Sequence, residues 1–100
     1  MEKLIEENIP RIKQLMLHYG VERAFLFGSA AKGTMKEGSD VDFIISFPED
    51  MNFVTYANNY FALADSLESL LNKHVDLVTE KTIKNPYLLE VINRNKLQLL

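Results

Sequence analysis

Residues 41–47 alternate between large apolar side chains and others, and this alternation sets narrow limits on the fold. The apolar positions are 41, 43, 45 and 47, and the positions between them include Asp42 and Ser46. A period of two is typical of a β-strand with one buried face. Apolar residues then recur at helical spacing over 53–71, and a second strand-like run covers 74–78. Because parallel strands need a connection of a dozen or more residues, we expect the helix to cross over and the two strands to run parallel.

Further elements are predicted on both sides of this unit. Apolar residues at 5, 9, 12, 16 and 19 predict an amphipathic helix that ends at Gly20, with Pro10 either in its first turn or at a kink. Residues 23–27 and 97–100 predict strands, 86–93 a helix, and 30–39 a loop with one helical turn at most. The order indicates an α/β (α+β) fold: a small mixed β-sheet with helices packed on one face. With 100 residues and no linker-like stretch, the chain reads as a single domain, 1–100.

Composition excludes several classes of protein. The chain has no cysteine, so disulfides and thiolate metal sites are ruled out. A net charge of −3 and a pI near 5.3 argue against direct nucleic-acid binding, which depends on a basic surface. No apolar run approaches the length of a membrane span, and the N-terminus lacks the apolar segment of a signal peptide. We therefore expect a cytoplasmic protein without membrane contact.

The residues with the clearest chemistry are Gly28-Ser29 and, after ten further residues, Asp40-x-Asp42. Asp40 and Asp42 are two apart on a strand, so both side chains leave the same face, about 7 Å apart along it. Two carboxylates on one face repel each other unless a cation lies between them, and Mg²⁺ takes oxygen ligands of this kind. The glycine allows backbone N–H groups to approach a phosphate, and Lys32 on the same loop can neutralise phosphate charge.

A third carboxylate is expected to join this pair. Asp76 lies near the start of the strand at 74–78, as Asp42 does in its own strand, so parallel strands would set the two level. Three carboxylates would then face one pocket. Two Mg²⁺ ions leave a residual charge of about +1, which an ATP triphosphate complements, and such a site suits in-line nucleotidyl transfer.

These residues resemble a known family. Residues 25–45, FLFGSAAKGTMKEGSDVDFII, and 67–78, LESLLNKHVDLV, are similar to the signature of the minimal nucleotidyltransferases of the DNA polymerase β superfamily, in particular the MntA-like antitoxins of HEPN–MNT pairs. The resemblance extends more weakly over nearly the whole chain. It implies the polymerase β-like nucleotidyltransferase fold, ATP as substrate, and transfer of AMP to a hydroxyl with release of pyrophosphate.

The resemblance also implies a role for each residue. Asp40 and Asp42 would hold both metal ions, and Asp76 would hold the ion nearest the acceptor and help to deprotonate its hydroxyl. Nucleotide-binding residues would be Gly28, Ser29, Lys32 and Ser39. The family usually has Ala-Arg-Gly where this chain has Ala31-Lys32-Gly33, and lysine lacks the bidentate fork of arginine. The implied partner is a helical HEPN ribonuclease toxin, which would carry the accepting hydroxyl.

Other interpretations remain open on the sequence. The chain could neutralise its partner by occlusion alone, without catalysis, or transfer a nucleotide to a small-molecule hydroxyl. Gly28 does not begin a P-loop, because Gly33 is followed by Thr34 and Met35 instead of Lys and Ser/Thr. His74 could orient Asp76 or lie at the rim. The aromatic residues of 53–71 are either core or interface, so homo- or hetero-oligomers are both compatible with the sequence.

Overall fold

A computed structural model describes residues 2–100 of the chain. Its elements, in chain order, are α1 (Lys3–His18), β1 (Arg23–Phe27), α2 (Ser29–Lys32), β2 (Val41–Ser46), α3 (Phe53–Leu71), β3 (Val75–Thr79), the 3-10 turn η1 (Glu80–Thr82), α4 (Pro86–Asn95) and β4 (Leu97–Gln98). The predicted order of elements is confirmed, and α2 is the helical turn expected after β1.

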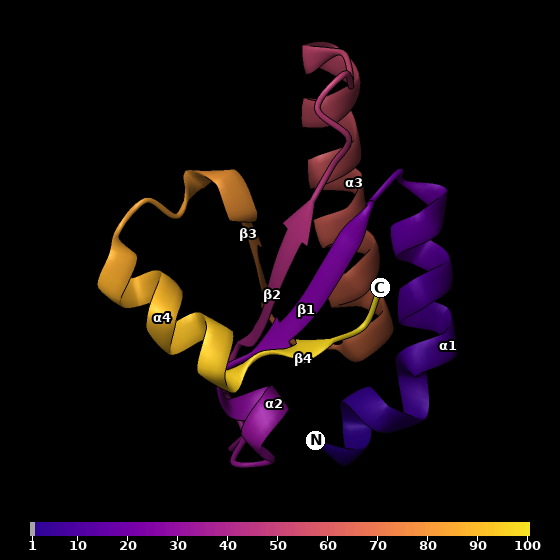
Figure 1. The fold of residues 1–100 in the computed structure, drawn as a ribbon. Coiled ribbons are helices and arrows are strands. Elements are labelled where there is room, and N and C mark those ends of the chain that lie inside the picture. The colour runs from indigo at the N-terminus through magenta and orange to yellow at the C-terminus, as the bar shows by residue number, and fades with distance from the viewer. Residues whose placement is uncertain (1) are drawn as a thin grey trace.

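The four strands form one mixed sheet in the order β3-β2-β1-β4 (Figure 1). Strand β2 pairs antiparallel with β1 and parallel with β3, while β4 pairs antiparallel with β1. In the parallel pair, Asp42 lies opposite Asp76. The predicted crossover by α3 is therefore confirmed, and β3 lies at one edge of the sheet.

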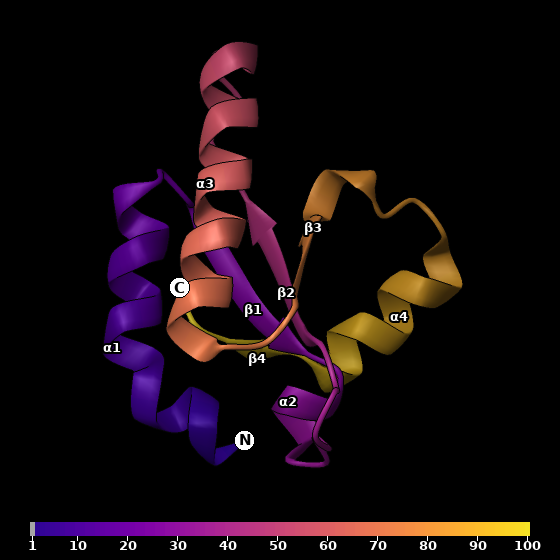
Figure 2. The same ribbon diagram turned by 180° about the vertical axis from the view of Figure 1, so that it is seen from behind.

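Helices α1 and α3 cover one face of the sheet, and the main core lies between them and the strands (Figure 2). The fully buried side chains there include Ile5, Ile12 and Met16 of α1, Leu26 of β1, Val41, Phe43 and Ile45 of β2, and Leu63 and Leu67 of α3. The apolar side of the 41–47 alternation is thus the core side, as predicted. Burying it supplies the main driving force for folding.

Helix α4 corrects the prediction that the helices pack on one face. Its Ile92 packs on the opposite side of the sheet, against Phe25 and Ile44. Both of these side chains leave the face that points away from α1 and α3. They form a second apolar surface that requires its own cover, and α4 provides it.

The ends and the bend of α1 follow from two residues. Pro10 lies well inside the helix, where it cannot donate the usual hydrogen bond, and the first turns are set at an angle to the rest (Figure 1). The kink, of the two alternatives for Pro10, is therefore the observed one. Gly20 ends the helix at φ +82°, a backbone conformation that glycine adopts without strain.

Helix α3 extends beyond the sheet. Nineteen residues span about 28 Å, whereas a strand of five or six residues spans less than about 20 Å. Its C-terminal half is buried through Leu63, Leu67 and Leu71, but Phe53 in its first turn is 79% exposed. Of the two alternatives for the aromatic residues of 53–71, core or interface, Phe53 is thus not core, because the N-terminal part of α3 projects past the strands (Figure 1).

Strand β3 lies at the sheet edge, but its backbone is partly occupied by side chains. Glu68 of α3 accepts a hydrogen bond from the Val75 N–H at 3.3 Å, and the Tyr60 hydroxyl donates to the Leu77 carbonyl. The hydroxyl of Thr82 donates to the Thr79 carbonyl at 2.8 Å. These contacts protect an edge that would otherwise pair with a strand of another chain.

Among residues 2–100, no helix combines the length and the apolar character that crossing a membrane requires.

Replacing Leu67 by alanine should lower the free energy of unfolding by about 3 kcal/mol, because this fully buried side chain fills the space between α3 and the sheet. Leu17→Ala is the matched control, since Leu17 is 62% exposed on α1, and it should change stability by less than about 0.5 kcal/mol. Urea denaturation followed by circular dichroism measures both. Equal losses for the two variants would contradict the core described here.

Candidate active site

The face of the sheet that carries α4 consists of three rows of side chains that run across the strands. They follow from the register, because residues opposite each other on neighbouring strands lie about 4.8 Å apart. From the start of β2 to its end, the acidic row is Phe27–Asp42–Asp76, the apolar row is Phe25–Ile44–Val78, and the polar row is Arg23–Ser46 with Glu80 directly after β3. Ile92 of α4 packs on the apolar row. Only the acidic row carries adjacent carboxylates.

The acidic row confirms that Asp42 and Asp76 are level. Asp42 is the register partner of Phe27 on one side and of Asp76 on the other. Asp40 lies just before β2, and its Oδ2 is 3.4 Å from Nδ1 of His74, the residue just before β3. Because β2 and β3 are parallel neighbours, their starts bring three carboxylates and one imidazole into one region.

Gly28 is required beside this row for a steric reason. It has φ +72°, and a Cβ built on it would lie 2.7 Å from Oδ2 of Asp42. A side chain here would displace the Asp42 carboxylate, and the positive φ strains any residue other than glycine. Gly28 is also the residue before α2, whose first residue is Ser29, so the predicted phosphate-binding pair lies directly next to Asp42.

The electrostatics of the acidic row disfavour its charged form. The pKa of the Asp42 carboxyl is raised above its ordinary value of 3.8, first by partial burial and then by the negative charges of Asp76 and Asp40. His74 acts in the opposite direction but does not cancel these effects. The row is therefore short of positive charge, a condition that a bound cation would relieve.

Only some of the predicted site residues lie next to each other. Asp42 and Asp76 are side by side, whereas Asp40 pairs with His74, and within residues 2–100 no three His, Asp or Glu side chains surround a single point. Ser39 closes a turn, since its hydroxyl accepts a hydrogen bond from the Lys36 N–H at 2.9 Å. Lys32 is exposed at the end of α2.

The pairing of His74 with Asp40 is the contact that the sequence did not indicate. The two alternatives considered for His74 were an orienting role toward Asp76 and a place at the rim. The contact joins residues 40 and 74, which are far apart in the chain, and only the parallel register of β2 and β3 brings them together.

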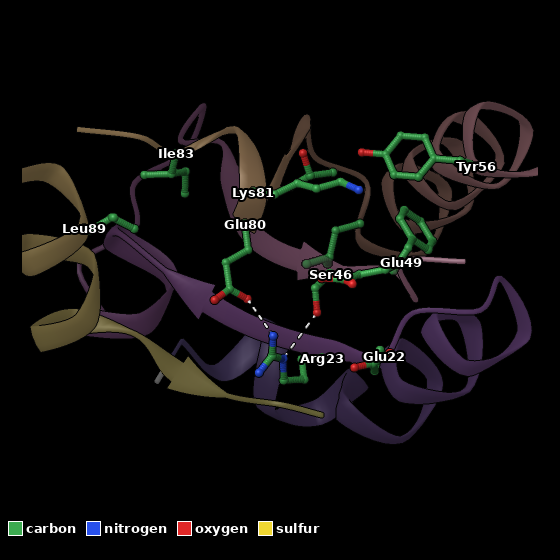
Figure 3. Close-up of a pocket in the computed structure, with 12 residues that line it drawn as sticks. Glu22, Arg23, Ser46, Glu49, Tyr56, Glu80, Lys81, Ile83 and Leu89 are labelled. Atoms are coloured by element: carbon green, nitrogen blue, oxygen red, sulfur yellow. Dashed lines mark hydrogen bonds and ion pairs between the residues drawn. The ribbon is translucent and has the colours of Figure 1, made fainter. Parts of the chain in front are cut away.

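A cavity of about 590 Å³ lies at the polar row, and it is separate from the acidic row (Figure 3). Arg23 crosses its wall, 3.6 Å from Glu80 and within 3.4 Å of the Ser46 hydroxyl. Ser46 is four residues beyond Asp42, about 13 Å along the strand, and the apolar row with Ile92 lies between them. The cavity is thus not where the carboxylates could act.

A mixed sheet with paired carboxylates at the starts of two parallel strands, beside a Gly-Ser turn, defines a nucleotidyltransferase. The comparisons with known proteins agree. The family model described as "Nucleotidyltransferase domain" matches residues 5–98, and the chain belongs to this family.

Relatives of known name share much of the chain. A protein of Methanocaldococcus jannaschii, provisionally named a protein adenylyltransferase, is 36% identical over 92 residues, which cover 91% of this chain and 90% of the relative. The protein adenylyltransferase MntA of Thermococcus cleftensis is 36% identical over 73% of this chain and 70% of its own. MntA of Shewanella oneidensis is 27% identical, and the match covers 94% of this chain but 58% of that longer protein.

Solved structures show the same fold. A protein provisionally described as a minimal nucleotidyltransferase superposes with a TM-score of 0.76 at 30% identity, covering 97% of this chain and 95% of that one. A crystal structure titled as a toxin–antitoxin with AMP-PNP superposes with a TM-score of 0.73 at 25% identity, over 93% of this chain and 73% of that one. The expected polymerase β-like nucleotidyltransferase fold is thereby confirmed.

Gly28→Ala should destabilise the chain by about 1 to 3 kcal/mol, because the new methyl group meets the Asp42 carboxylate and the backbone stays at positive φ. Gly38→Ala separates the two causes: Gly38 also has positive φ, at +91°, but nothing lies within 4 Å of its Cβ position. The Gly38 variant should lose less. Thermal unfolding of both variants tests the steric part, and equal losses would contradict it.

Asp42→Asn should stabilise the fold at neutral pH, by about 0.5 kcal/mol or about 2 to 4 °C in Tm, because it removes a carboxylate that lies directly opposite Asp76. The sign follows from the raised pKa: ionising Asp42 costs more in the folded than in the unfolded chain, so the penalty grows as pH rises through that raised value. The gain should vanish below the ordinary value of 3.8, where Asp42 is protonated in both states. Scanning calorimetry from pH 3 to pH 8 checks this, and a gain independent of pH would contradict it.

Proposed function

We propose that this chain transfers AMP from ATP to a hydroxyl of a partner protein, a HEPN-type toxin, and so acts as an antitoxin. The observation that carries the proposal is the register of β2 and β3, which sets Asp42 beside Asp76 and next to Gly28. The cytoplasm, which supplies ATP, is the expected compartment. Membership in the nucleotidyltransferase family supports the reaction class.

The acidic row fits Mg²⁺ by the chemistry of its donors. Asp42 and Asp76 offer carboxylate oxygens, the ligands that this ion prefers, and the pKa of Asp42 is raised first by burial and then by the charge of Asp76, both of which a bound cation would offset. We propose that Asp40 and Asp42 hold two ions and that Asp76 holds the one nearest the acceptor. Bound there, Mg²⁺ would neutralise phosphate charge and lower the pKa of the attacking hydroxyl.

The residues of the chain have separate tasks in the proposed reaction. Gly28 and Ser29 bind the β- and γ-phosphates, Lys32 neutralises phosphate charge, and Ser39 also contacts the nucleotide. Asp76 accepts the proton of the acceptor hydroxyl, whose oxygen forms a bond to the α-phosphorus of ATP. The bond from that phosphorus to the β-phosphate oxygen breaks, and pyrophosphate leaves with the electron pair. His74, paired with Asp40, keeps this carboxylate at the start of β2.

A protein acceptor is supported by the relatives. The matching proteins of Thermococcus cleftensis and Shewanella oneidensis are both named protein adenylyltransferase MntA. The structure titled as a toxin–antitoxin with AMP-PNP contains an analogue of ATP, which supports ATP as the donor. The cavity at the polar row gives no support to a small-molecule acceptor, because the apolar row separates it from Asp76.

Incubation with ATP, Mg²⁺ and the HEPN-type protein proposed as its partner should raise the mass of that partner by one AMP group for each hydroxyl modified. Asp42→Asn and Asp76→Asn should each reduce the rate more than about 100-fold, because each removes a charge from the acidic row. Glu7→Gln, an exposed carboxyl on α1, is the control and should keep the parent rate. Intact-mass spectrometry of the partner measures the AMP added by the parent chain and by each of the three variants.

Two results would reject the proposed function. Neutralisation of the partner by Asp42→Asn as complete as by the parent chain would indicate a binding antitoxin. Pyrophosphate release with a hydroxylated small molecule, and none with the protein, would indicate the small-molecule alternative.

A further inference from the structure

The overhanging half of α3 forms one wall of an apolar groove. Phe53, Ala57 and Phe61 lie one helical turn apart along α3, and Leu77 and Val78 of β3 form the opposite side. We call this surface the α3 groove; its volume is about 410 Å³. Phe53 and Phe61 are 79% and 66% exposed, and two phenylalanines this exposed on one helix are a feature that folding alone does not explain.

The α3 groove begins next to the acidic row. Leu77, on its floor, follows Asp76 directly in the chain, and the Tyr60 side chain on its wall donates its hydroxyl to the Leu77 carbonyl. The charge of Asp76 contributes, after burial, to a raised pKa of that hydroxyl, which confirms that the two are within electrostatic reach. A molecule bound in the groove therefore lies at the open edge of β3, beside the carboxylate proposed to face the acceptor.

Acidic side chains predominate on the α3 side of the groove. Residues 48–71 contain four acidic side chains, Glu49, Asp50, Asp65 and Glu68, and no basic one. One basic side chain, Lys81, lies near the groove, because its Nζ is 5.9 Å from the centre of the Tyr56 ring, and Tyr56 lines the groove. Its charge offsets one of the four negative charges. An occupant complementary to this surface has apolar side chains flanked by lysine or arginine.

The backbone of β3 indicates how such an occupant binds. Val75 N–H and the carbonyls of Leu77 and Thr79 are already hydrogen-bonded to Glu68, Tyr60 and Thr82. An added strand would have to displace these contacts. Side chains inserted between α3 and β3, in contrast, meet an apolar surface that is already open.

We propose that the α3 groove is the docking site for the protein that accepts AMP, and that it binds a segment whose apolar side chains are flanked by basic ones. Docking there brings a hydroxyl of that partner beside Asp76. The proposal rests on the proposed function for the existence of a protein acceptor, but it assigns the surface that recognises it. Helix α4 also exposes apolar side chains, Tyr87 and Val91 among them, but it carries no excess of negative charge to attract a basic partner: Glu90 is paired with Arg94, and Lys96 follows the helix.

The test measures binding separately from catalysis. The Asp42→Asn chain, which should be unable to transfer AMP, is titrated by calorimetry with the HEPN-type protein proposed as its partner. Adding Phe53→Ser and Phe61→Ser should weaken binding at least tenfold, whereas Tyr87→Ser and Val91→Ser on α4 should change it less than twofold. In the active chain, the same α3 changes should raise KM for the partner and leave the affinity for ATP unchanged.

A charge variant tests the complementarity. Asp65→Lys, on the same face of α3 as Phe61, should weaken binding several-fold and reduce its dependence on salt. Glu7→Lys on α1 makes the same charge change away from the groove and should have a smaller effect.

Several results would overturn the proposal. The first three are no binding by the chain with an unchanged groove, equal binding by the α3 variants, and a larger loss of binding with the α4 variants. The fourth is a molar mass of the chain alone, measured by light scattering, that corresponds to a dimer and falls to that of a monomer in the α3 variants; this would identify the groove as a contact between two copies. Failure of the proposed function is distinguishable. Binding that depends on Phe53 and Phe61 without AMP transfer rejects the catalytic role only, and AMP transfer unaffected by these changes rejects the docking site only.

Discussion

The parallel pairing of β2 with β3 is the interaction on which the rest of this structure depends. It requires α3 to cross over the sheet, and the same packing buries Leu63 and Leu67 against Phe43. It also sets Asp42 directly opposite Asp76, where two like charges repel. The hydrophobic core thus holds in place a pair of carboxylates that would separate if they were free to do so. A fold selected for stability alone would not contain this pair.

The alternation of β2 places core residues on one face of the sheet and site residues on the other. Val41, Phe43 and Ile45 point to the core, and Asp42 and Ile44 point away from it. A shift of register by one residue would bury a carboxylate and expose a valine, so the core fixes the register strongly. Gly28 adds a second constraint, since a larger residue at this position would collide with Asp42.

Much of this arrangement was predictable from the sequence, because periodicity and turn chemistry are local. The bounds of β1 and α3 and the level placement of Asp42 and Asp76 all follow from spacing. Periodicity does not reveal how far a sheet extends, so the sequence leaves open whether the aromatic residues at the start of α3, Phe53 among them, are core or interface. Nor does it reveal which face a helix covers when both faces carry apolar residues, and α4 was misplaced for that reason.

Two features of the molecule cost stability, and both lie against β3. The acidic row gathers negative charge at the start of the strand, and the α3 groove exposes phenylalanines along its outer side. Between them, the side chains of Tyr60 and Glu68 occupy the edge of β3, which limits pairing with other strands without covering the apolar wall. An edge that excludes strands but stays open to side chains is selective about what it binds. Such selectivity is what the proposed recognition of a protein acceptor at the α3 groove requires.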